Sequence, residues 1–196
     1  MDNRGSRCAL AATILLGVTS FFYFFGRPVP VERVHIDAPD DIYADMLFYR
    51  PGIRQPQTVP SSTGLIDDDD EVIGISVRGR HRAYSVSTMA DFKRHVVNDL
   101  IAHVPVTVTY CGRTRCARAL TGDEGSDEPL TVVGRGWFDG HMMIGLAGST
   151  YAQDAESIPG LTDMKFEKTT WKEWKTAHPD TDIYVESSEA SGGAAD

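Results

Sequence analysis

The stretch TVTYCGRTRCARAL, residues 107–120, predicts a β-hairpin. Apolar and polar residues alternate up to Cys111, and a second alternating run begins at Cys116. Residues 112–115, with the sequence Gly-Arg-Thr-Arg, would form the loop between the two strands. Cys111 and Cys116 would then face each other across the hairpin, where opposed Cα atoms are about 4.5 to 5.5 Å apart, a distance that a disulfide can span.

The two faces of this hairpin differ in polarity, because the side chains of a strand alternate between its faces. Thr107 and Thr109 share a face with Cys111. The opposite face is more apolar and is expected to form the core; it carries Val106, Val108, Tyr110, Ala117 and Ala119. The cysteines are therefore expected on the more polar side of the hairpin.

The cysteine pair allows several interpretations. In an oxidising compartment it would be a structural cross-strand disulfide. The cations Arg113, Arg115 and Arg118 favour thiolate at either sulfur, which is the condition for a redox-active pair. Inert thiols are a further alternative.

A metal site is the remaining interpretation of the two sulfurs. They would need additional ligands, for which His95, His103 or His141 could supply nitrogen. No HxxxH pattern and no second CxxC accompanies them. We therefore predict neither a metal nor another cofactor.

The hydrophobic period changes after residue 86 and predicts a helix that ends before Pro105. Ser87 or Thr88 could cap it, and its apolar stripe would comprise Met89, Phe92, Val96, Val97, Leu100 and Ile101. On this helix His95 and Asp99 would lie one turn apart, with Asn98 between them, and could orient an imidazole toward a thiol. Alternatively these side chains are solvated, or Asn98 and Asp99 tie down the following turn.

The remaining pattern is that of an α+β domain, mainly antiparallel β with two short helices. Residues 72–86 predict a hairpin, and short strands are expected at LTVV, WFDG, HMMIGLA, TYAQD and DIYV. Thr170 and Glu173 form a capping-box pattern at the start of the second helix. Trp171 and Trp174, three residues apart on this helix, are expected to anchor it in the core.

The N-terminus adds a predicted transmembrane helix to this fold. Residues 8–26 contain 19 residues without a charge. As a helix they would be roughly 28 Å long, about the thickness of a bilayer's hydrocarbon core. We interpret residues 1–27 as an uncleaved single-pass signal anchor, residues 28–64 as a Pro-rich spacer, residues 65–185 as the α+β domain and residues 186–196 as a disordered tail. The domain is expected on the extracytoplasmic side of the cell membrane.

The charge of the chain argues against two classes of partner. Its net charge is −9, and because residues 1–27 carry one Asp and three Arg, the rest of the chain carries −11. Such an acidic surface disfavours nucleic acid and anionic lipid as partners. A protein or a small molecule stays open as the partner.

Three segments, taken in order, resemble the bacterial family known as domain of unknown function 3179. They are DDDDEVIGISVRGRHRAYSV, HVVNDLIAHVPVTVTYC and TTWKEWKTAHPDT, and the resemblance covers residues 65–185. The chain has Ala102-His103 where many relatives have Gly-Gly, and C-G-R-T-R-C where many have a C-P-L-C type motif. The resemblance implies a fold and a location type but no established reaction. Some relatives are named as possible selenoproteins, and a selenocysteine at the positions that match Cys111 or Cys116 would add weight to redox chemistry.

Two functions of different classes follow from these observations. The first is thiol–disulfide redox chemistry by a membrane-anchored extracytoplasmic domain, with Cys111 and Cys116 as the reacting pair. Its supporting residues would be His95, Asn98, Asp99, Arg113, Arg115 and Arg118. The second is a non-catalytic binding or scaffold domain in which the cysteines form a structural disulfide. The sequence leaves open whether the protein is an enzyme.

Overall fold

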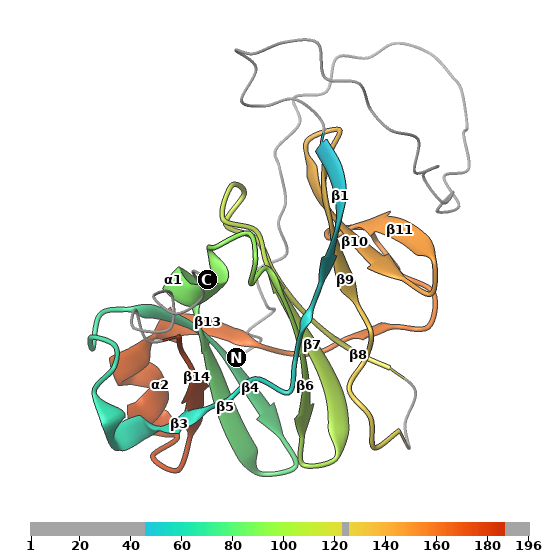
Figure 1. The fold of residues 1–196 in the computed structure, drawn as a ribbon. Helices are drawn as coiled ribbons and strands as arrows, with labels where there is room; N and C mark the ends of the chain where they lie inside the picture. The colour runs from blue at the N-terminus through green and yellow to red at the C-terminus, as the bar shows by residue number, and fades with distance from the viewer. Residues whose placement is uncertain (1–45, 123–125, 187–196) are drawn as a thin grey trace, which may run out of the picture.

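The structure is a computed structural model that describes residues 46–122 and 126–186 (Figure 1). The predicted membrane anchor at residues 8–26 lies outside the described residues. Within the described ranges, no helix is long and apolar enough to cross a membrane.

The described residues form three β-sheets, which we name by their positions. The central sheet has the strand order β12 (Thr162–Asp163), β8 (Ala117–Thr121), β7 (Val104–Tyr110), β6 (Val96–Ile101) and β2 (Ile53–Arg54). The outer sheet has the order β1 (Met46–Pro51), β9 (Val133–Phe138), β10 (His141–Leu146) and β11 (Ser149–Ala152). The helix-side sheet has the order β13 (Glu167–Thr170), β4 (Glu71–Val77), β5 (Arg80–Ser85), β14 (Asp182–Tyr184) and β3 (Val59–Pro60).

Two α-helices occur in the described part, α1 (Val86–Met89) and α2 (Trp171–Ala177), with a 3-10 turn at Ser61–Thr63. All strand pairs are antiparallel except β2 with β6 and β14 with β5. The predicted class, mainly antiparallel β with two short helices, is thereby confirmed for these residues.

The sheets and α2 are arranged in layers, with the outer sheet and α2 at opposite ends of the molecule (Figure 1). One apolar cluster joins the helix-side and central sheets and includes Ile73, Tyr84 and Val108. A second joins the central and outer sheets, and a third lies between the helix-side sheet and α2. The central sheet is therefore buried on both faces, which makes its strands apolar over most of their length.

The predicted helix after residue 86 is wrong beyond its first turn. Only Val86–Met89 is helical, and Val96–Ile101 is strand β6. Val96 and Val97 point to opposite faces of this strand, and their exposed fractions are only 3% and 0%. A strand covered on both faces gives an apolar run that cannot be told from a helical stripe by its period. The layering of the sheets thus overrides the helical interpretation.

The predicted hairpin at residues 72–86 is confirmed as β4 and β5. Arg78 and Gly79 form its turn, and both have positive φ, 48° and 77°. Such a two-residue turn with φ > 0 at both positions matches the twist of the paired strands.

The predicted C-terminal helix and its capping box are also confirmed. The Thr170 side chain accepts a hydrogen bond from the backbone N–H of Glu173, and the Glu173 side chain accepts one from the N–H of Thr170. Trp174 is buried, and its indole N–H donates to the Thr181 hydroxyl at 2.9 Å. Gly74 makes room for this indole, because a Cβ there would lie 2.3 Å from ring atoms of Trp174.

The end of the predicted spacer contributes strands to the sheets. The residues from Met46 to Pro51 form β1 at the edge of the outer sheet. β2 and β3 join the central and helix-side sheets.

Candidate functional site

Cys111, the first of the predicted site residues, directly follows β7 and lies inside the apolar cluster between the central and outer sheets. Its exposed fraction is 1%, and the cluster around it includes Val96, Leu120 and Val132. The expectation of a core on the opposite face holds, since Val108 is buried there. The face of the cysteine is buried as well, because the outer sheet covers it.

Cys111 and Cys116 are joined by the backbone of the hairpin. The N–H of Cys111 donates to the carbonyl of Cys116 at 2.9 Å, and the N–H of Arg115 donates to the carbonyl of Cys111 at 2.8 Å. Arg115 has a positive φ of 57°, which closes the loop. Cys111 is a free thiol, so the predicted bond between the two cysteines is not formed in the structure.

The predicted supporting residues on β6 do not converge on the cysteines. Asn98 and Asp99 are neighbours on a strand and therefore point to opposite faces. The Asn98 side chain donates to the carbonyl of Val132 at 2.8 Å and accepts from the Thr107 hydroxyl at 2.7 Å. The ring of His95 lies 3.2 Å from the carbonyl of Ala90, and burial lowers its pKa.

Asp99 instead takes part in a buried ionic network between the central and helix-side sheets. The Arg82 guanidinium donates to both of its carboxylate oxygens at 2.9 and 2.8 Å, and the Tyr84 hydroxyl donates at 2.6 Å. Arg82 also forms a bidentate pair with Asp182 at 2.7 and 2.8 Å. Burial, followed by the nearby Asp99 charge, raises the pKa of Tyr84. Because each group has a partner, this network has the properties of a structural element.

The three predicted arginines are held by other groups. Arg113 lies over the Trp137 ring, with Cζ 4.7 Å from the centroid, and Arg115 pairs with Glu71 at 3.1 Å. Arg118 pairs with Asp163 at 2.6 Å and also donates to two backbone carbonyls at 2.7 and 2.8 Å. These contacts fix the loop and the segment after β11. They do not build a thiolate site around Cys111.

A different set of side chains has unsatisfied hydrogen-bonding capacity. Within the described residues, the buried side-chain nitrogens without a hydrogen-bond partner are the Nε atoms of Arg50 and Arg135. They lie on neighbouring strands, β1 and β9. A buried donor without an acceptor costs about 1 to 3 kcal/mol, so each such group calls for an explanation.

Irregular strand pairing positions Arg135. Between Gly134 and Gly136, β9 has one residue more than β10, and β1 has one residue more than β9. Gly136 has a φ of 91°, and a Cβ there would lie 2.0 Å from the carbonyl oxygen of Met46, so only glycine fits. Bulges of this kind redirect a side chain at the edge of a sheet.

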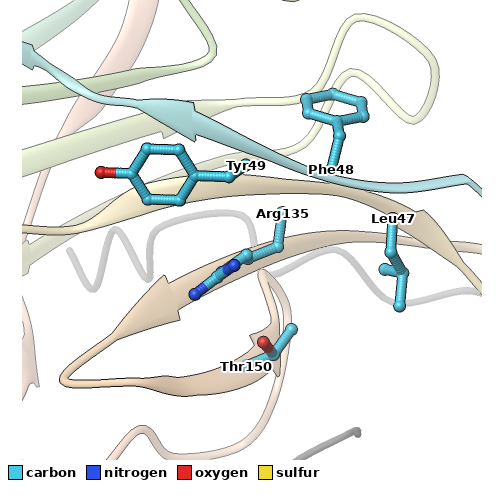
Figure 2. A pocket seen from close by; sticks show the side chains of 5 residues that line it. All are labelled: Leu47, Phe48, Tyr49, Arg135 and Thr150. Carbon is cyan, nitrogen blue, oxygen red and sulfur yellow. The ribbon is translucent and has the colours of Figure 1, made fainter. Parts of the chain in front are cut away.

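The Arg135 side chain lies across β10 and beneath the ring of Tyr49. A Cβ on Gly145 would lie 2.7 Å from its Nε, so this glycine leaves the space that the arginine occupies. Its Cζ is 5.4 Å from the centroid of the Tyr49 ring, which is 62% exposed. Figure 2 shows the guanidinium of Arg135 and the hydroxyl of Thr150 on the same side of β1 as Leu47, with Phe48 pointing away. These residues line a hollow of about 90 Å³.

Aromatic side chains surround the second unpaired arginine. The Cζ of Arg50 is 5.1 Å from the centroid of the exposed Phe92 ring, which meets Phe48 edge-on at 6.3 Å. Met46, Tyr49 and Phe92 are three of the four exposed large apolar residues of the described chain. Cations and exposed aromatic rings thus concentrate at this edge in a chain that is acidic as a whole, a composition found at binding surfaces.

A short motif in the sequence is a weak signal for this site. Two glycines that flank an arginine inside a strand, as in GRGWF at residues 134–138, indicate a bulge. The pairing of that bulge with β1, which brings Tyr49 over Arg135, cannot be read from the motif.

A family model described as protein of unknown function (DUF3179) matches residues 50–192, most of the chain, and the chain therefore belongs to this family. The resemblance seen in the sequence is confirmed. No curated protein and no solved structure matches the chain.

Proposed function

We propose that this member of the DUF3179 family is a non-catalytic binding domain. In this proposal residues 8–26 tether it to the cell membrane, with the domain on the extracytoplasmic side. The observation that carries the binding function is the buried Nε of Arg135, which has no acceptor and lies beneath the exposed Tyr49 ring.

The comparison with two other partly buried arginines supports this proposal. Arg82 and Arg118 stabilise the fold, because carboxylates and carbonyls accept their hydrogen bonds. The buried Nε of Arg135 has no such acceptor, so in the free protein this atom carries a desolvation cost without a compensating bond. A ligand that supplies the acceptor would remove this cost, as expected of a residue retained for binding rather than for stability.

The burial of Cys111 is the reason to prefer binding over redox chemistry. Thiol–disulfide exchange requires an accessible thiolate. Cys111 is almost fully buried among apolar side chains, and the arginines of the hairpin have other partners.

Redox chemistry is the second candidate, favoured by the direct opposition of the two cysteines across the hairpin backbone. It is tested by titrating the full-length protein against glutathione buffers and following the mass of the Cys111–Cys116 peptides. A bond between these two cysteines that opens and closes near the potential of glutathione would support it. The absence of such a bond at every potential would exclude it.

The binding proposal is tested through the stability of two matched variants, Arg135→Met and Arg118→Met, in the full-length protein. Methionine keeps a long, flexible, apolar side chain but has no donors. We expect Arg135→Met to leave the free energy of unfolding unchanged or raise it by up to about 1 kcal/mol, because an unsatisfied donor is removed. Arg118→Met should lower it by about 2 to 4 kcal/mol, because Asp163 and two carbonyls lose their partner.

Urea unfolding of each variant, followed by tryptophan fluorescence, measures both changes. Equal destabilisation by the two substitutions would make Arg135 a structural residue, and the proposed function would be abandoned.

The membrane tether is tested separately by fractionation. The full-length chain should stay with the membrane in high salt and in carbonate, and a chain without residues 1–27 should be released. Recovery of the full-length chain in the soluble fraction would contradict the tether without affecting the binding site.

A further inference from the structure

The hollow beside Arg135 has one charged wall and several apolar walls. Leu47 and the Tyr49 ring supply the apolar surface, Thr150 supplies a hydroxyl, and Arg135 is the one cation among the lining residues. The chemistry of its ligand can be worked out from this composition.

The guanidinium of Arg135 is matched by a planar anionic acceptor. Nε–H and a terminal N–H of a guanidinium form a fork that matches the two oxygens of a carboxylate, giving two parallel hydrogen bonds. In the free protein the Nε member of this fork has no acceptor. The Thr150 hydroxyl can donate a further hydrogen bond to one carboxylate oxygen.

The size and the number of charges limit the ligand further. A cavity of about 150 Å³ holds benzene, and this hollow measures about 90 Å³, which leaves space for a carboxylate with a few carbon atoms. Phosphate sites gather several cations or backbone N–H groups, whereas a single guanidinium balances one negative charge. The apolar walls suit a short aliphatic body.

We infer that this hollow binds a short-chain organic monocarboxylate through Arg135, an inference that rests on the proposed binding function. Tyr49 acts as a movable cover, since its ring is exposed and lies over the guanidinium. A rotamer change of an exposed side chain is fast, so rotation of this ring opens Nε to the ligand. The Tyr49 ring and the Arg135 Nε–H are therefore the two groups whose surroundings change on binding.

The full-length protein is titrated with propionate, and the ¹⁵N-detected Nε–H signal of Arg135 and the ring signals of Tyr49 are followed by NMR. Propionamide, a neutral molecule of nearly the same shape, and inorganic phosphate are titrated in parallel. We expect saturable shifts of both residues with propionate and none with propionamide. Phosphate should bind at least about tenfold more weakly, because it cannot use the apolar walls.

Arg135→Lys keeps the charge and removes the fork, and it should weaken propionate binding about tenfold to a hundredfold. Arg50→Lys is the matched control, because Arg50 is also an arginine with an unpaired Nε but does not line the hollow. It should leave propionate binding unchanged within about twofold.

The inference is overturned if propionate gives no saturable shift, if propionamide or phosphate binds as well as propionate, or if Arg50→Lys weakens binding as much as Arg135→Lys. If Arg135→Met does not lower the free energy of unfolding but propionate does not bind, the ligand class is refuted. The proposed binding function would still stand. Strong destabilisation by Arg135→Met would refute the proposed function itself.

Discussion

Cys111 should be alkylated far more slowly in the native protein than in the unfolded chain. A reagent can reach its sulfur only after the end of the β7–β8 hairpin separates from the outer sheet. This opening uncovers at least Cys111 and Leu120, both 1% exposed, and breaks the hydrogen bond between Cys111 and Cys116. Exposing two buried side chains of this kind costs about 3 to 5 kcal/mol, which corresponds to a rate reduction of roughly one hundredfold to several thousandfold.

The assay compares the alkylation rate of the reduced full-length chain at neutral pH in buffer and in concentrated urea. Mass spectrometry of the peptide that contains Cys111 reports this residue alone. The substitution Cys111→Ser should lower the free energy of unfolding by about 1 to 3 kcal/mol, since it places a hydroxyl among apolar side chains. Cys111→Ala should cost about 1 kcal/mol, mainly through the small cavity left behind.

A native alkylation rate within tenfold of the unfolded rate would refute this reasoning, because a packed thiol cannot react at that speed. So would a native chain in which Cys111 is found bonded to Cys116. Either result, together with a Cys111→Ser variant of unchanged stability, would favour the redox function over the binding function.

Three further predictions concern the fold. Asp99→Ala should lower the free energy of unfolding by about 3 to 5 kcal/mol, measured by urea unfolding, because it removes a buried carboxylate from Arg82; a loss below about 1 kcal/mol would place this network at the surface. Gly74→Ala should cost about 1 to 3 kcal/mol or more, since its Cβ would lie 2.3 Å from the Trp174 ring, and a variant as stable as the parent in thermal unfolding would contradict that contact. Burial lowers the pKa of His95 below its unfolded value, so the stability it contributes is present above about pH 6.5 and is lost as the pH falls through its folded pKa. His95→Gln should therefore reduce the difference in stability between pH 7.5 and pH 5.5, and an unchanged difference would argue against burial of the ring.

The elements that the sequence determined are those with local causes. The turn at Arg78 and Gly79 forms β4 and β5 because neighbouring residues define both the turn and its register. The Thr170 capping box starts α2 for the same reason, since its hydrogen bonds join residues three apart. The family was also recognisable from three segments of the chain, and the family model matches residues 50–192.

Tertiary structure decided which residues form the candidate site. The outer sheet covers the face of the β7–β8 hairpin that carries Cys111, so a cysteine expected on the more polar side of this hairpin became part of the core. The same layering turned the expected helix around Asn98 and Asp99 into β6, in which these two neighbours point to opposite faces.

The site at Arg135 depends on contacts that no short segment contains. Tyr49 is 86 positions before this arginine and Gly145 is 10 positions after it, and the two bulged pairings bring all three together. The alternation of residues along one strand predicts which side chains lie on each of its two faces. The contacts of Arg135 depend instead on which strands become neighbours. Local sequence therefore specified the strands, and their packing against one another specified which arginine was left without a partner.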